Sequence, residues 1–232
     1  MFSNSPKCQS CVVCDIKSPL FSLLSRDELH RINIDRYEVD YKSGDYLFKQ
    51  GSAANNILSL TRGKVKLYLE GINGQNLAFK VAKQWELLGG PGLFIDNRHH
   101  YSARAIEDVT ICFINLDRFK EATRTNVEFG DLFWKQINLE TVHLYNRYLS
   151  NSQKQMHGRL ADVLLYLSSE VFSGTNCDIH IKKQDLAELS GMTRDSVVRV
   201  LKRFCTDQII QMNDNHIIIV NASKLEEISR LG

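Results

Sequence analysis

The sequence predicts an α+β protein, because its residue pattern changes twice along the chain. Residues from about 20 to 120 contain short runs of partly alternating apolar and polar residues, separated by glycine-containing turns. Apolar residues at helical spacing follow from about 128 to 150. The chain from about 156 onward combines helical stretches with one pair of short apolar runs. We therefore expect an antiparallel sandwich or barrel, a long helix and a small α-rich domain.

The composition is typical of a globular protein of the cytoplasm. Of the 232 residues, 43% are hydrophobic and 24% are charged, which disfavours disorder. No run of apolar residues is long enough to span a membrane, and the first residues lack a secretory signal. In a reducing cytoplasm, cysteines are more often free, metal-bound or catalytic than paired. The net charge of +2 gives no global reason to expect nucleic-acid binding.

Seven short runs in the first part are expected to be strands. Turns such as RG, INGQ and GGPG separate them. The runs are residues 37–41, 45–50, 57–61, 64–70, 76–82, 101–106 and 109–114.

The long helix has two possible uses. Its apolar stripe either packs on the helix's own sheet or forms the seam of a coiled-coil dimer. If it forms a dimer interface, we expect that interface to contain Phe133, Ile137, Thr141, Leu144 and Tyr148.

The segment QDLAELSGMTRDSVVRVLKRF (184–204) has the pattern of a helix-turn-helix. Leu186 and Leu189 face inward on a first helix, and Ala187 is small where two helices would cross. Gly191 fits the left-handed turn, and Thr193 can cap the second helix. A pair of strands within 207–220, turning at 213–215, resembles the wing of a winged helix, and a final helix follows with Ser223 as its expected N-cap.

The polar face of the second helix suits DNA recognition. Six Lys or Arg and three acidic residues lie between 182 and 203, so the local charge is 6 − 3 = +3. Arginine reads guanine edges, and the first residues of a recognition helix are those that reach bases. A plain helical hairpin with solvated charges is the alternative. The expected DNA-binding residues are Lys183, Thr193, Arg194, Asp195, Ser196, Val198, Arg199, Lys202 and Arg203.

Three cysteines, Cys8, Cys11 and Cys14, lie within seven residues. This spacing resembles the start of a ferredoxin run, in which three thiolates bind one iron–sulfur cluster and the fourth ligand comes from elsewhere. Zinc binding and a thiol redox switch are alternatives. A ferredoxin-like electron carrier or redox enzyme is an alternative from a different class of function. A single cysteine run and the lack of a nucleotide-binding glycine loop disfavour it, and we expect no enzyme.

Taken together, the chain resembles the CRP/FNR family of transcriptional regulators. The resemblance covers residues from about 20 to 232 and includes Gly44–Gly51 (GDYLFKQG), residues 99–105 (HHYSARA) and the helix-turn-helix. It implies a cyclic-nucleotide-binding-like β-roll (jelly roll), a dimerisation helix and a winged helix-turn-helix. It also implies a homodimer that binds an inverted repeat in double-stranded DNA and contacts RNA polymerase. The implied divisions are 1–19 (cysteine-rich segment), 20–125 (β-roll), 126–152 (dimerisation helix) and 153–232 (DNA-binding domain).

The chain departs from the cyclic-nucleotide binders of this family. Gly89-Gly90-Pro91 lacks the glutamate that binds ribose, and Tyr101 stands where the phosphate-binding arginine is usual. A buried phosphate without that arginine would be poorly neutralised, so we expect no cyclic AMP. In the recognition helix, Asp195 replaces the usual glutamate four residues before Arg199. We expect Arg199 to read a guanine, and the rest of the half-site stays open.

The cysteines resemble those of the fumarate–nitrate reductase regulator group. There Cys112 corresponds, by its place in the last β-roll strand, to the fourth ligand of a [4Fe–4S] cluster. The resemblance implies that Cys8, Cys11, Cys14 and Cys112 hold a cluster sensitive to oxygen, nitric oxide or redox state. Two departures are a shorter spacing between the second and third cysteines and Leu144 in place of an acidic residue. Haem sensing of nitric oxide, with His99 or His100 as a ligand, and thiol sensing of oxidants are alternatives.

Overall fold

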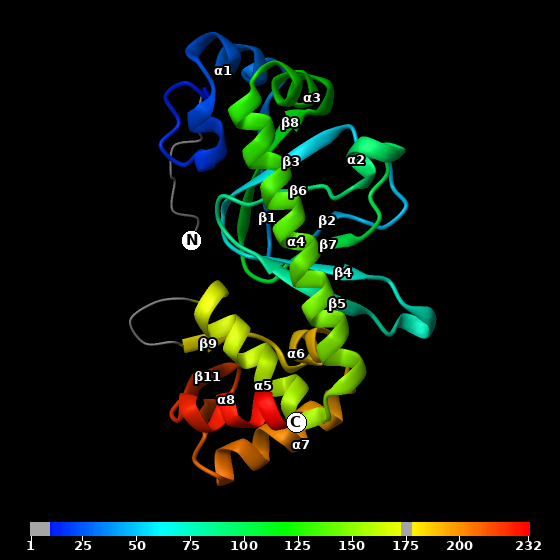
Figure 1. Ribbon diagram of the computed structural model, residues 1–232, viewed down its shortest axis with the longest axis vertical. Coiled ribbons are helices and arrows are strands. Elements are labelled where there is room, and N and C mark those ends of the chain that lie inside the picture. Colours follow the sequence, from blue (N-terminus) through cyan, green and yellow to red (C-terminus); the bar gives the residue numbers. More distant parts are fainter. Residues whose placement is uncertain (1–9, 173–177) are drawn as a thin grey trace. The chain divides into compact units, whose positions relative to one another are not determined.

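The computed structural model describes residues 10–172 and 178–232, so Cys8 and Cys177 lie outside the described residues (Figure 1). The chain divides into two compact units. Unit 1 contains the residues up to 65 and 82–140, and unit 2 contains 66–81 and 141–232. Among the described residues, no helix has the length and apolar character needed to cross a membrane.

Unit 1 contains an antiparallel sheet of four strands in the order β1-β8-β3-β6. Its strands are β1 (Tyr37–Tyr41), β8 (Val109–Asn115), β3 (Asn56–Arg62) and β6 (Leu87–Leu88). A second pair, β2 (Tyr46–Phe48) and β7 (Ser102–Ala105), is also antiparallel. Of the strands that the alternation predicts, five lie here, and β6 is an additional short strand.

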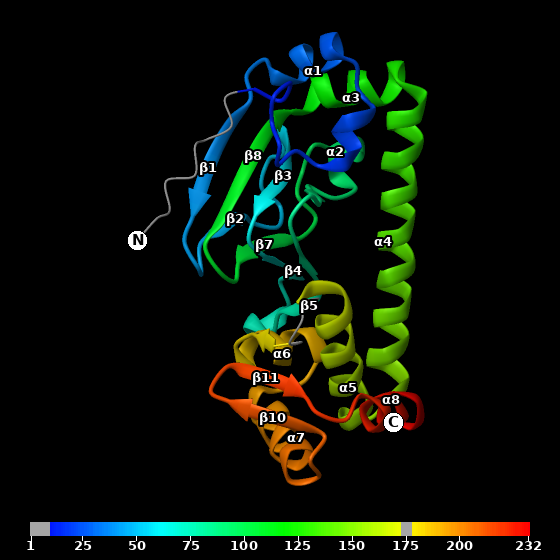
Figure 2. The ribbon, with the colours of Figure 1, turned by 90° about the vertical axis from the view of Figure 1, so that its left-hand side faces the viewer.

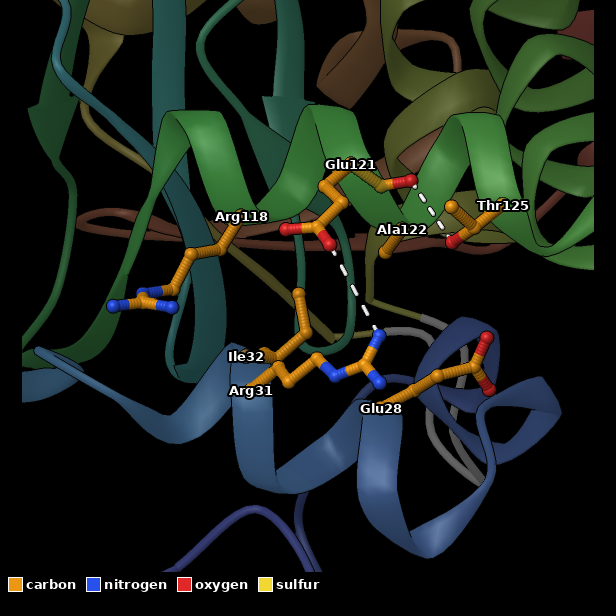
Figure 3. A pocket seen from close by; sticks show the side chains of 7 residues that line it. All are labelled: Glu28, Arg31, Ile32, Arg118, Glu121, Ala122 and Thr125. Atoms are coloured by element: carbon orange, nitrogen blue, oxygen red, sulfur yellow. Dashed lines mark hydrogen bonds and ion pairs between the residues drawn. The ribbon is translucent and has the colours of Figure 1, made fainter.

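Short helices close one end of unit 1, and the strand pattern alone did not predict them. They are η1 (Pro19–Leu23), α1 (Arg26–Asn33), α2 (Gly92–Ile95) and α3 (Leu116–Thr125). A capping box fixes the start of α1, because Ser25 and Glu28 satisfy each other's backbone N–H groups. Figure 3 shows α1 facing α3 across a shallow pocket, where Arg31 reaches toward Glu121.

The long helix α4 (Val127–Gln153) starts where the sequence predicts it (Figure 2). The Asn126 side chain accepts a hydrogen bond from the Phe129 N–H at 3.0 Å and so caps its first turn. Phe129 and Phe133 are buried in a core cluster with Phe21 and Phe119. The first turns of α4 therefore belong to the core of unit 1.

Unit 2 contains the neighbouring strands β4 (Val65–Leu69) and β5 (Leu77–Ala82), with the short η2 (Ile72–Gly74) between them. It also holds α5 (Met156–Tyr166), a π-helical turn at Leu167–Val171, α6 (Lys183–Ser190), α7 (Arg194–Thr206) and α8 (Ala222–Leu231). A three-stranded sheet has the order β10-β11-β9, from Ile210–Asn213, His216–Ile219 and Asp178–His180.

Two details of unit 2 differ from the sequence-based expectation. The strand β9 adds a third strand to the predicted hairpin by pairing with β11. The N-cap of α8 is Asn221, whose side chain accepts from the Lys224 N–H at 2.9 Å, so the expectation of Ser223 was wrong. Asn221 precedes the helical residues and bonds the third of them, which is the geometry that an N-cap requires.

Candidate functional site

The turn between α6 and α7 has the geometry of a helix-turn-helix. Gly191 ends α6 in the left-handed region, with φ of 60° and ψ of 37°. Thr193 begins α7 by accepting a hydrogen bond from the Ser196 N–H at 3.2 Å. Leu186 and Leu189 are fully buried, as their spacing predicts. These contacts fix the direction of α7 relative to α6.

The outer face of α7 presents most of the predicted DNA-binding residues to solvent. Arg194, Asp195, Arg199, Lys202 and Arg203 are exposed, and Ser196 and Val198 are half-buried. Asp195, Val198, Arg199 and Lys202 line one shallow hollow on this face. The inner face is buried through Val197, Val200, Leu201 and Phe204. The helix therefore separates a packed side from a basic side.

Lys183 lies differently from the residues of α7. Its ammonium donates to the Asp214 carbonyl and, at 3.4 Å, to Asn215 Oδ1, both in the turn between β10 and β11. It thus ties the start of α6 to the tip of the wing. A phosphate contact by Lys183 stays a prediction.

Two acids of α6 do not lie on a solvated face. Asp185 and Glu188 each accept from the Lys66 ammonium at 2.5 Å, within unit 2. The Lys66 side chain is only 3% exposed and that of Glu188 9% exposed. The two acids therefore share one cation, and sequence reasoning missed this because Lys66 lies 119 positions from Asp185.

The predicted dimer residues fall on different faces of α4. Phe133 is buried in the core of unit 1, and Ile137 packs against that core. Leu144 and Tyr148 are 40% and 78% exposed. Other exposed apolar side chains of this helix are Val127, Trp134, Leu139, Val142, Tyr145 and Leu149. A dimer interface along this exposed set stays a prediction.

The described cysteines of unit 1 come from two distant parts of the chain. Cys11, Cys14 and Cys112 are all buried, and Cys11 and Cys112 belong to the same core cluster. Cys112 lies in β8 opposite Glu38 of β1 and Ser59 of β3. It shares a face of β8 with Ile114, because alternate residues of a strand point to the same side. Among residues 10–172 and 178–232, no group of three His, Cys, Asp or Glu is arranged to hold a metal ion.

A polar network joins the two cysteine segments. The Cys11 N–H donates to Asn33 Oδ1 at 3.0 Å, and the same oxygen accepts from Arg36 Nε at 3.2 Å. Arg36 Nη1 in turn donates to Cys112 Sγ at 3.3 Å and to Glu38 Oε1 at 3.2 Å. Burial opposes the charge of Arg36, but the nearby Cys112, Cys11 and Glu38 outweigh it and raise the pKa of the guanidinium. Sequence reasoning missed this network.

Aromatic rings pack together beside the β2–β7 pair of unit 1. The Tyr101 hydroxyl accepts from the Gly89 N–H at 3.0 Å, and Tyr101 is only 8% exposed. A Cβ on Gly90 would lie 2.4 Å from the Tyr101 ring, so the ring packs directly on this glycine turn. His99 stacks on Phe48 with centroids 3.7 Å apart, and burial lowers its pKa. His100 is exposed and pairs with Asp96 at 3.1 Å.

Family comparisons agree with this geometry. The model of the cyclic nucleotide-binding domain matches residues 38–126, and that of the Crp-like helix-turn-helix domain matches 158–228. The chain is 23% identical to the transcriptional regulatory protein btr of Bordetella pertussis, over 97% of this chain and 94% of that protein. It is 24% identical to the fumarate and nitrate reduction regulatory protein of Vibrio cholerae, over 96% and 90% of the two chains.

A solved structure gives the same fold. FixK2 from Bradyrhizobium japonicum matches with a TM-score of 0.75 at 18% identity, covering 83% of this chain and 96% of that one. The β-roll strands, the long helix and the winged helix-turn-helix thus occur in the order that the sequence predicts. The chain belongs to the CRP/FNR family of DNA-binding transcriptional regulators.

Proposed function

We propose that this regulator controls its affinity for an inverted-repeat DNA site through a [4Fe–4S] cluster held by Cys8, Cys11, Cys14 and Cys112. The observation that supports the proposal most directly is the placement of Cys11 and Cys112 in one core cluster, joined through Asn33 and Arg36. When bound, the cluster would supply a link between the N-terminal segment and β8 that oxygen, nitric oxide or a change of redox state can break.

The described residues fit such a cluster in part. Thiols are the donors that iron–sulfur clusters use, and three of the four proposed ligands are buried cysteines of unit 1. The fourth, Cys8, lies outside the described residues. Zinc uses the same donors, and the iron and sulfide content distinguishes the two kinds of site.

The packing of unit 1 offers a path from the cysteines to the long helix. Phe21 follows the cysteine segment and contacts Phe129 of α4, with ring centroids 5.8 Å apart. Phe119 of α3, which follows β8, contacts Phe133 at 5.0 Å. Releasing the N-terminal cysteines from β8 would loosen these contacts and bias α4 between two packings. Because family members act as dimers, such a change would alter the spacing of two recognition helices.

The basic face of α7 supports the DNA-reading part of the proposal. Arg199 and Asp195 are exposed four residues apart on one face, where an arginine can read a guanine edge and a carboxylate can accept from a cytosine amino group. Lys202 and Arg203 extend the face toward the DNA backbone. Contact with RNA polymerase and the homodimer along α4 belong to the same proposal.

Cyclic AMP is not the effector that this interior favours. The Tyr101 side chain packs against the glycine turn. Its hydroxyl accepts from the Gly89 N–H, and its ring lies against Gly90. Its side chain offers no positive charge to a cyclic phosphate.

The test is the visible spectrum and the iron and sulfide content of protein purified without oxygen, before and after air. We expect a broad brown band with about four irons per chain, bleached by air. Cys112→Ser should lose most of the iron and sulfide. Cys205→Ser is the matched control, because Cys205 lies half-buried in α7 and should be dispensable. A colourless protein that contains zinc, or a sharp haem band, would reject the cluster and leave DNA binding intact.

A further inference from the structure

The cysteine site contains a buried cation that no sequence motif marks. The side chains of Arg36 and Glu38 are only 7% and 4% exposed, and they pair at 3.2 Å. Arg36 precedes β1, and Cys112 lies in β8, whose residues Val109–Phe113 pair with β1. Burying a charged pair is costly unless its hydrogen bonds are well satisfied, so a structural role alone is an expensive use of these residues.

The guanidinium bonds Cys112 directly and is linked to Cys11 through Asn33. Its Nη1 donates to Cys112 Sγ at 3.3 Å, and its Nε donates to Asn33 Oδ1, which also accepts the Cys11 N–H. Within the N-terminal segment, the Lys17 ammonium also donates to the Cys11 carbonyl at 3.4 Å. One planar group thus sets the position of a β8 sulfur relative to the backbone of the N-terminal segment.

We propose that Arg36 is a positioning residue of the cysteine site, which orients Cys112 Sγ for ligation and places a fixed positive charge beside the bound cluster. The inference rests on the proposed function. A hydrogen bond to a ligating sulfur and a nearby positive charge both stabilise the more negative, reduced form of a cluster. Arg36 therefore raises the reduction potential and slows loss of the cluster.

The test compares Arg36→Met with wild type, both purified and reconstituted without oxygen. In Arg36→Met we expect the affinity for cluster iron, measured by competition with a chelator, to fall by about 10- to 100-fold. The reduction potential should become more negative, and the visible band should bleach faster in air. Arg36→Lys keeps the charge but loses the planar fork, so it should recover the potential in part.

A control variant and a test of folding use the same part of unit 1. Arg31→Met removes an arginine of α1 whose side chain is 60% exposed. Its ion pair with Glu121 is long at 4.0 Å, so this variant should match wild type. Arg36→Met removes the cation that pairs with Glu38, so Arg36→Met/Glu38→Gln is measured as well. Circular dichroism of both variants reports whether unit 1 stays folded.

The outcomes separate this inference from the function on which it rests. If wild type never takes up iron and sulfide, the proposed cluster fails and the role of Arg36 fails with it. If wild type holds the cluster and folded Arg36→Met or the double variant shows the same potential and the same chelator competition, only the role of Arg36 is overturned.

Discussion

At the scale of single residues, Arg199 and Lys202 point from the same face of α7 but should contribute differently to DNA binding. Arg199 lies one helical turn after Asp195, where it can reach a base, whereas Lys202 lies nearer the helix end. Arg199→Ala should cost about 1–3 kcal/mol of binding free energy and relax the preference at one base pair. Titration of operator DNA and single-base variants by fluorescence anisotropy measures both.

Lys202→Ala should weaken binding to all sequences alike. Removing one phosphate contact reduces the slope of log affinity against log salt by about 1. The same anisotropy titrations at several salt concentrations give this slope. Equal loss of sequence preference in the two variants would show that the assignment of base and backbone roles is wrong.

At the scale of elements, the starts of α1 and α4 are coupled through Glu28. Its carboxylate accepts from the Ser25 N–H at 2.7 Å and from Asn126, the residue that caps α4. The hydrogen bonds from Ser25, followed by that from Asn126, hold the pKa of Glu28 below its ordinary value of 4.5. Folding therefore favours the ionised form, and this stabilisation is complete above pH 4.5 and is lost as the pH falls through the folded pKa.

The prediction is a pH-dependent difference between wild type and Glu28→Gln. The variant should lose part of the capping energy, about 0.5–2 kcal/mol, at neutral pH and should show a smaller loss of stability on acidification below pH 4.5. Urea unfolding of the two proteins across this range provides the measurement. If the free energy of unfolding falls equally with pH in wild type and in Glu28→Gln, Glu28 is not responsible for the loss of stability in acid.

A second element-scale prediction concerns the link between β4 and α6. Lys66→Met removes the cation that the half-buried Asp185 and the buried Glu188 share, and we expect a loss of about 3–5 kcal/mol in the free energy of unfolding. Lys66→Met/Asp185→Asn/Glu188→Gln should recover much of it, because no buried charge then remains unpaired. Lys64→Met is the control, since the Lys64–Glu107 pair is half-exposed and should change stability by about 1 kcal/mol or less. No recovery in the triple variant, or an equally large loss of stability in Lys64→Met, would show that unpaired buried acids are not the cause of the loss.

At the scale of the whole molecule, the exposed stripe of α4 should hold two chains together. Leu144→Glu places a charge in this apolar set and should shift sedimentation from dimer to monomer, with a matching loss of operator affinity. Phe133→Ala should behave differently. It removes a buried ring from the core of unit 1 and should cost about 3–5 kcal/mol of unfolding free energy. If Leu144→Glu remains a dimer, the exposed stripe of α4 is not the interface.

The sequence predicted what depends on local pattern. Gly191, the cap at Thr193 and the inward leucines define the helix-turn-helix within about twenty residues, and the alternating runs mark the strands. It could not decide whether Phe133 faces the core of its own domain or a second chain. Helical spacing shows which residues share a face of the helix but not what that face packs against. It also missed Lys66 against α6 and Arg36 against Cys112, since these pairs form only when distant segments meet.

The close approach of Gly232 to Gly158 has a practical consequence for anyone who purifies the protein. A Cβ on Gly158 would lie 2.6 Å from the Gly232 carbonyl carbon, and the Gly232 carbonyl accepts from the Gln155 N–H at the start of α5. An affinity tag fused after Gly232 would crowd this contact. The turn at Ile72, which is 87% exposed, is the better place to insert one.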